Sequence, residues 1–137
     1  MSSATESRTT RTSILIVEDF PLLRSSVMQW LQMRFPECLI HGVGSAEEAL
    51  AHVGASRTDV VLMDIDLPGM NGLEAVAQMK ALSPETAVVM LTMHDTPGHR
   101  HAATSAGAVG YVAKIDMEDH LGPLLEALLE SRSGKAR

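Results

Sequence analysis

A three-layer α/β fold, with helices covering both faces of a parallel sheet, is the fold class that this sequence predicts. Five short, partly β-branched apolar runs alternate with longer segments in which apolar residues recur at helical spacing. Three of the runs, 13–17, 59–63 and 87–91, are apolar nearly throughout, which is typical of strands buried on both faces. The runs cover residues 13–17, 39–43, 59–63, 87–91 and 109–112. A chain that alternates in this way forms right-handed crossovers over one sheet.

Local signals place the first two helices. The segment 21–35 begins with Pro21, and proline suits the first turn of a helix. The second helix is expected to begin at Ser45, because Glu48 follows three residues later and the two residues form a capping box.

The third and fourth helices differ in their apolar content. The third follows Asn71-Gly72, and Leu73, Val76 and Ala77 form its predicted inner stripe. The fourth, around residues 97–106, is mostly alanine with small polar residues and has no large apolar anchor. We therefore expect the fourth helix to be weakly held against the sheet.

The last helix contains a local conflict. Asp116 is placed to cap its N-terminus, but Pro123 would then lie inside the helix and remove a hydrogen bond. Either the regular helix begins near Gly122, or it is kinked there. The sequence leaves both alternatives open.

Length and composition limit the classes of protein to consider. A chain of 137 residues suits one domain, and its net charge of -6 argues against nucleic acid as a direct partner. Cys38 is the single cysteine, which excludes an intramolecular disulfide and favours a reducing compartment. We expect a cytoplasmic protein, with a disordered extension at 1–12, one domain at 13–131, and a polar tail or linker stub at 132–137.

Polar side chains that could bind a ligand or take part in a reaction follow four of the five predicted strands. Glu18 and Asp19 end the first, Asp64 the third and Thr92 the fourth, while Lys114 follows the fifth. Each residue alone could have an ordinary structural role, such as capping a helix or lying in a solvated loop. Together they fall on the edge of the sheet where such folds bind ligands, and three carboxylates there repel one another unless a cation joins them. Mg²⁺ fits this set, and a lysine and a hydroxyl beside it predict a phosphoryl-transfer site.

Four motifs carry these residues. They are ILIVEDFP at 14–21, VVLMDIDLPGMNG at 60–72, VMLTMH at 89–94 and AGAVGYVAK at 106–114. Their order and spacing resemble the CheY-like receiver domain family of two-component response regulators, and the NarL/LuxR-type subgroup most. The resemblance covers about residues 13–130 and implies a flavodoxin-like fold with five parallel strands in the order 2-1-3-4-5.

The resemblance implies a role for each acidic residue. Asp64 would be the phosphoacceptor. Glu18, Asp19 and Asp64, with the backbone carbonyl of Asp66, would bind Mg²⁺ or Mn²⁺, and Asp19 would be the more direct ligand of the acidic pair.

It also implies the residues that respond to the phosphoryl group. The Thr92 hydroxyl and the Lys114 ammonium would bind it, and Thr92 and Tyr111 would act as the conformational switch. Asp66 and His94, two residues after Asp64 and Thr92, would modulate the rate of hydrolysis.

The function implied is that of a phosphoacceptor signalling domain, which catalyses only its own phosphotransfer and dephosphorylation. The donor would be a sensor histidine kinase or a phosphotransfer protein. The face formed by the fourth helix, fifth strand and fifth helix would change on phosphorylation and bind a partner or a second copy of the chain. No membrane association is expected.

The sequence departs from the family pattern at two points, and two alternative functions also fit part of it. Ile115 stands where many relatives have proline, and the helix-turn-helix domain of NarL-type chains is not in this sequence, so direct binding of nucleic acid is not expected. Asp64 and Asp66 also resemble the nucleophile motif of haloacid-dehalogenase phosphatases, for which steady turnover of a phosphate ester would be diagnostic. A passive docking module would bind Mg²⁺ without accepting phosphate.

Overall fold

The computed structural model describes residues 11–93 and 96–136, and the backbone alone from residue 132 onward. The strands are β1 (Ser13–Val17), β2 (Leu39–Val43), β3 (Val60–Asp64), β4 (Ala87–Thr92) and β5 (Gly110–Ala113). The helices are α2 (Pro21–Arg34), α3 (Ala46–Ala55), α4 (Gly72–Leu82), α5 (Pro97–Ala106) and α6 (Met117–Ala136), with a 3₁₀ turn η1 (Lys114–Asp116) before the last.

The strands form one sheet in the order β2-β1-β3-β4-β5, and every neighbouring pair is parallel. The chain runs from β1 outward to β2, returns across β1 to β3, and then continues outward through β4 to β5. The direction of winding therefore reverses between β1 and β3, and this switch point opens at the carboxyl ends of both strands. The predicted fold class and strand order are confirmed.

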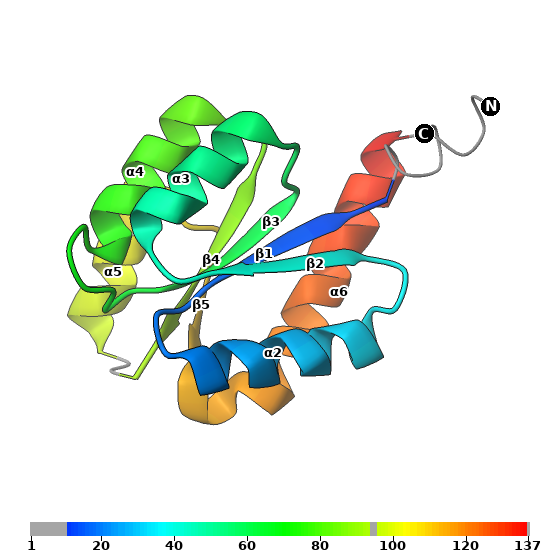
Figure 1. Ribbon diagram of the computed structural model, residues 1–137, viewed down its shortest axis with the longest axis horizontal. Coiled ribbons are helices and arrows are strands. Elements are labelled where there is room, and N and C mark those ends of the chain that lie inside the picture. Colours follow the sequence, from blue (N-terminus) through cyan, green and yellow to red (C-terminus); the bar gives the residue numbers. More distant parts are fainter. Residues whose placement is uncertain (1–10, 94–95, 137) are drawn as a thin grey trace.

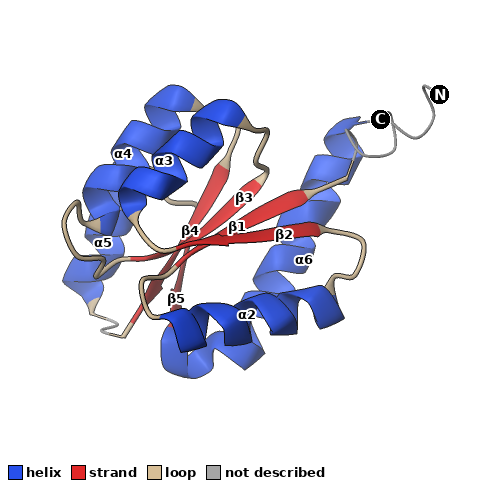
Figure 2. Cartoon of the chain, in the orientation of Figure 1, coloured by secondary structure: helices blue, strands red, loops and turns tan. Residues whose placement is uncertain are grey.

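Helices cover both faces of the sheet, as Figures 1 and 2 show. On one face α3, α4 and α5 pack against alternate residues of the strands, and on the other face α2 and α6 pack against the residues between them. All five residues of β3 and all six of β4 are buried, whereas the edge strand β2 has no buried residue. The apolar runs thus distinguish central strands from an edge strand.

The cap of α3 forms as expected, with one change of partner. The backbone N–H of Glu48 donates to the Ser45 hydroxyl oxygen at 3.1 Å. The Glu48 carboxylate accepts a 2.8 Å hydrogen bond from the N–H of Gly44, rather than from the N–H of Ser45 as in a regular capping box. The side chain therefore fixes the chain one residue further back, at the end of β2.

The predicted inner stripe of α4 was partly wrong. Val76 is buried and Leu73 is half-buried, but Ala77 is exposed, and Ala75 and Met79 are buried instead. The reason lies at Gly72, whose close contact with β3 sets the rotation of the helix. In α5 only Ala103 is buried, in agreement with the weak anchoring expected.

The last helix begins upstream of its proline. It starts at Met117, directly after η1, and Pro123 lies inside it. The alternative in which regular helix begins near Gly122 is therefore wrong. The backbone of residues 132–136, expected to form a polar tail, continues this helix. At the other end, the Arg11 guanidinium donates to the Glu37 carbonyl at 3.1 Å, while residues 1–10 of the expected extension lie outside the described residues.

Gly72, at the start of α4, lies close to the end of β3. A Cβ atom there would lie 2.8 Å from the Asp64 carbonyl oxygen, 2.8 Å from the Ile65 Cα and 2.9 Å from the Met90 Cε. Two of these neighbours are backbone atoms, which have little freedom to move.

We therefore expect Gly72→Ala to lower the free energy of unfolding by about 1–3 kcal/mol through overpacking. Gly54→Ala is the matched control, because Gly54 lies in α3 and nothing stands within 4 Å of its Cβ position. That change should raise stability by roughly 0.5–1 kcal/mol through helix propensity. Urea unfolding of both variants measures the difference, and equal effects would contradict the close contact at Gly72.

Candidate functional site

Four of the predicted site residues meet at the carboxyl edge of the sheet. Glu18 directly follows β1, Asp64 is the last residue of β3, Thr92 is the last residue of β4, and Lys114 directly follows β5. Glu18, Asp64 and Thr92 are each no more than 5% exposed. The parallel register brings side chains far apart in sequence into one cluster.

Lys114 is the centre of this cluster. Its ammonium group donates to Glu18 Oε1 at 2.8 Å and to Asp64 Oδ2 at 3.0 Å. The Lys114 side chain is 10% exposed, so both ion pairs are largely shielded from water. A buried ion pair gains little net stability because of the cost of desolvation, but it fixes the positions of its members.

Burial and charge shift two pKa values at the site. Burial raises the pKa of Glu18 and the nearby charge of Asp64 adds to the effect, although the hydrogen bond from Lys114 opposes it. Burial alone would lower the pKa of Lys114, but its hydrogen bonds to Glu18 and Asp64 and their negative charges outweigh burial and raise it. Lys114 therefore stays a cation at neutral pH and provides a fixed positive charge.

A third carboxylate stands beside this pair. Oxygen atoms of Glu18, Asp19 and Asp64 lie within 4.8 Å of one another, and Asp19 is exposed while the other two are buried. Three carboxylates outnumber the one ammonium group, and an all-oxygen donor set with access to water suits Mg²⁺. The residues present therefore fit the metal that the sequence predicts.

The loop after β3 holds the second oxygen of Asp64. The Asp66 backbone N–H donates to Asp64 Oδ1 at 2.9 Å, while the Asp66 side chain is exposed. The Ile65 N–H donates to the Leu91 carbonyl of β4 at 2.9 Å, and Gly69 has a positive φ of 77° that turns the loop back toward α4. Both carboxylate oxygens of Asp64 are thus oriented by hydrogen bonds.

Two residues that sequence reasoning missed hold Glu18. The Phe20 N–H donates to Glu18 Oε2 at 3.2 Å, and the Arg24 guanidinium donates to the Glu18 backbone carbonyl at 2.8 Å. Arg24 lies in the first turn of α2, where nothing in the residue pattern distinguishes it from an ordinary exposed arginine.

Tyr111, the predicted switch residue, is half-buried on β5. The guanidinium carbon of Arg100, on α5, lies 4.9 Å from the centre of the Tyr111 ring. This contact links β5 to α5, in which only Ala103 is buried. His94, predicted to modulate hydrolysis, lies outside the described residues.

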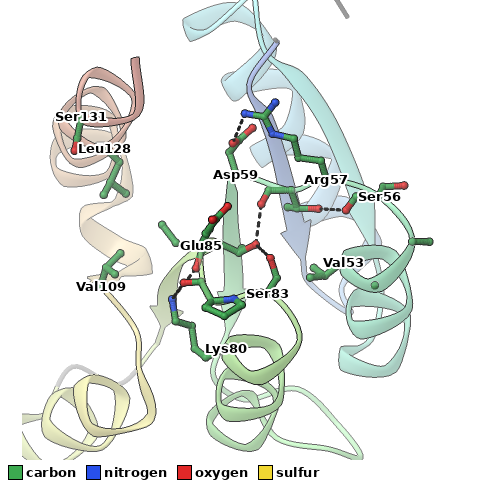
Figure 3. Close-up of a pocket in the computed structure, with 16 residues that line it drawn as sticks. Val53, Ser56, Arg57, Asp59, Lys80, Ser83, Glu85, Val109, Leu128 and Ser131 are labelled. Carbon is green, nitrogen blue, oxygen red and sulfur yellow. Dashed lines mark hydrogen bonds and ion pairs between the residues drawn. The ribbon is translucent and has the colours of Figure 1, made fainter. Parts of the chain in front are cut away.

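The described surface includes a larger and a smaller hollow. The larger, about 890 Å³, lies at the amino edge of the sheet (Figure 3), and Glu18, Asp19 and Asp64 do not line it. Its charged groups are paired: Arg57 contacts Asp59 at 3.1 Å, and the Lys80 ammonium donates to the carbonyls of Pro84 and Thr86 at 2.9 Å each. The smaller, about 450 Å³, lies between α2 and η1 and includes Lys114 in its wall.

Comparisons with known proteins agree on one family. The family model of the response regulator receiver domain matches residues 14–125. The nitrate/nitrite response regulator NarL of Escherichia coli K12 is 29% identical over 123 residues, which are 90% of this chain and 56% of that protein. The chain spans about half the length of the curated relatives that it matches.

Solved structures give the same result. A two-component response regulator of the LuxR family from Aurantimonas sp. SI85-9A1 has a TM-score of 0.82 and 28% identity, over 89% of this chain and 87% of that chain. The response regulator TrrA of Thermotoga maritima, solved in complex with Mg²⁺-BeF, has a TM-score of 0.76 and 28% identity, over 85% of this chain and 98% of that chain. No helix in the described part of the chain has the length and apolar character required to cross a membrane. The chain belongs to the response regulator receiver domain family of two-component systems, and its relatives are of the NarL/LuxR type.

Proposed function

We propose that this chain accepts a phosphoryl group on Asp64 from a sensor histidine kinase or a phosphotransfer protein. An oxygen of the Asp64 carboxylate bonds to phosphorus while the bond from phosphorus to the donor breaks, and the product is an acyl phosphate. Water later attacks phosphorus, the bond from phosphorus to the Asp64 oxygen breaks, and inorganic phosphate leaves the restored carboxylate. The single observation that carries the proposal is the buried cluster in which Lys114 joins Asp64 to Glu18 at the switch point.

The acidic residues would bind the metal that this reaction needs. Glu18, Asp19 and Asp64, with the backbone carbonyl of Asp66, would hold Mg²⁺, or Mn²⁺ in its place; the converging oxygens of the three carboxylates support this assignment. Bound there, the cation would neutralise charge on the transferred phosphoryl oxygens. Lys114 would pair with the same oxygens, and the Thr92 hydroxyl would donate to them.

The output would be read from the face formed by α5, β5 and α6. A phosphoryl group adds about two negative charges at the carboxyl edge. The Thr92 hydroxyl moves toward this group, and the Tyr111 ring turns inward to fill the space that Thr92 leaves. Tyr111 is held by Arg100 through a cation–π contact worth about 0.5–1 kcal/mol, which is small enough to exchange. A partner or a second copy of the chain would bind the altered face. We place these events in the cytoplasm.

The first prediction from this proposed function concerns the phosphoacceptor. Incubation with Mg²⁺ and acetyl phosphate should label the chain, hydroxylamine should remove the label because it is an acyl phosphate, and Asp64→Asn should abolish labelling. Asp66→Ala is the control: it should keep the label but change its half-life, because the exposed Asp66 side chain would border the path of water, as would His94. Full labelling of the Asp64→Asn variant, measured by intact mass, would exclude Asp64.

The second prediction concerns the metal. Since three carboxylates repel one another, Mg²⁺ at ten times its Kd should stabilise the fold by about 1.4 kcal/mol. Asp19→Asn should weaken this response, whereas Glu130→Gln, which removes an exposed carboxylate from α6, should not. Thermal unfolding with and without Mg²⁺ tests the site, and a wild-type Tm that does not change on addition of Mg²⁺ would contradict it.

The third prediction concerns the switch. Beryllofluoride with Mg²⁺, an analogue of the phosphoryl group, should change amide hydrogen exchange within residues 93–115, because α5 buries only Ala103 and is displaced at low cost. Thr92→Ala should mute the change. Thr104→Ala is the control, since that exposed hydroxyl only bonds back to the Arg100 carbonyl. Exchange that changes only around Asp64 would mean that this chain lacks the switch.

A further inference from the structure

Arg24 contacts the candidate site, but the proposed reaction gives it no role. Its guanidinium Nη1 donates at 2.8 Å to the backbone carbonyl of Glu18, which lies six residues earlier in the chain. From this geometry we infer that Arg24 is a positioning residue for the metal site, which holds the main chain of the acidic pair so that its carboxylates converge. The inference rests on the proposed function and adds to it a residue outside the ligand set.

The main chain of Glu18 is held from two directions. Its N–H donates to the Val43 carbonyl at the end of β2 at 3.1 Å, and its C=O accepts from Arg24. Glu18 stands one residue beyond β1, and its hydrogen bond to Val43 completes the β1–β2 pairing at Val17. The Arg24 hydrogen bond therefore fixes the peptide unit between Glu18 and Asp19, from which the side chain of Asp19, the exposed member of the carboxylate cluster, departs. The Val43 hydrogen bond fixes the peptide unit before it.

The end of β2 leaves room for the Arg24 side chain. A Cβ atom at Gly42 would lie 3.3 Å from both Cγ and Cδ of Arg24, and one at Gly44 would lie 3.1 Å from its Nη1. Gly44 is itself held by the 2.8 Å hydrogen bond from its N–H to the Glu48 carboxylate. Two glycines, spaced by one residue on the same strand end, thus form a channel that directs the guanidinium to the carbonyl.

The charge of Arg24 opposes the effect of its hydrogen bond. A guanidinium close to the acidic pair repels a divalent cation, so removal of the charge alone should tighten Mg²⁺ binding. Removal of a group that positions metal ligands should weaken Mg²⁺ binding, typically by tenfold or more. The two explanations therefore predict opposite signs for the same substitution.

The test compares Arg24→Met with Arg24→Lys by calorimetric titration with Mg²⁺. Methionine keeps the apolar stem in the channel but has neither donor nor charge, and lysine keeps both. We expect Arg24→Met to raise the Kd for Mg²⁺ by about tenfold and Arg24→Lys to restore most of the affinity. Phosphorylation of Arg24→Met by acetyl phosphate should be slow at low Mg²⁺ and recover at saturating Mg²⁺, a split that general destabilisation would not produce.

Arg34→Met is the matched control. Arg34 lies at the other end of α2 and pairs with Glu126 of α6 at 2.7 Å, so its loss removes the same charge from the same helix without touching the acidic pair. Its Kd for Mg²⁺ should stay at the wild-type value. Gly44→Ala is a second, independent variant, because the added Cβ would lie 3.1 Å from Nη1 and push it by a few tenths of an ångström while the charge remains, and it too should weaken Mg²⁺ binding, by less than Arg24→Met does.

Each outcome decides the matter. A Kd that rises in Arg24→Met and Gly44→Ala but not in Arg34→Met supports the inference; should Arg24→Met fail to fold, Gly44→Ala against wild type gives the same comparison. A Kd for the folded Arg24→Met that is equal to or lower than the wild-type value overturns it and leaves the proposed function in place. Wild-type protein that binds no Mg²⁺ overturns both.

Discussion

The two ion pairs of the Lys114 ammonium, with Glu18 and with Asp64, are the interactions on which the rest of the site depends. Lys114 follows β5 at one edge of the sheet, and it reaches carboxylates that follow β3 and β1. It therefore spans the carboxyl ends of the strands, past the end of β4, where Thr92 stands. Because a buried ion pair adds little net stability, this contact is better understood as one that arranges charges than as one that holds the fold. Stability comes from the two apolar layers beneath it, in which three central strands are almost entirely buried.

Much of this arrangement is predictable because strand ends are easy to locate. Apolar runs end abruptly at Glu18, Asp64 and Thr92, and a parallel sheet brings all carboxyl ends to one edge, so the cluster follows from the pattern and the topology. The same reasoning separates central strands from the edge strand β2. Once the ends are placed, the choice of Mg²⁺ follows from the chemistry of carboxylates.

The parts that could not be predicted depend on the rotation of a helix or on backbone acceptors. The stripe of α4 differs from the expected one because Gly72 packs on the Asp64 backbone, and this contact turns Ala77 to the solvent. The sequence left the start of α6 open because a proline within a helix removes one hydrogen bond. In the structure the burial of Leu121 and Leu125 offsets that loss, and the helix continues through Pro123. Arg24 was missed because its acceptor is a carbonyl, and a carbonyl leaves no trace in the residue pattern.

The contacts divide the carboxyl edge into a firm half and a loose half. Around β1 and β2, Glu18 is held by Lys114, by Arg24 and by the Val43 carbonyl, and Gly42 and Gly44 leave space for the Arg24 side chain. Around β5, α5 contributes one buried alanine, and Tyr111 is held by the exposed cation of Arg100. A site that must bind a cation and a phosphoryl group in a fixed geometry gains from ligands that do not move, since each freedom removed beforehand is not lost on binding. A surface that must report the event gains from the opposite, because a small difference in free energy can shift it only when few contacts hold it. The uneven distribution of buried surface around one sheet edge therefore meets both requirements within a single fold.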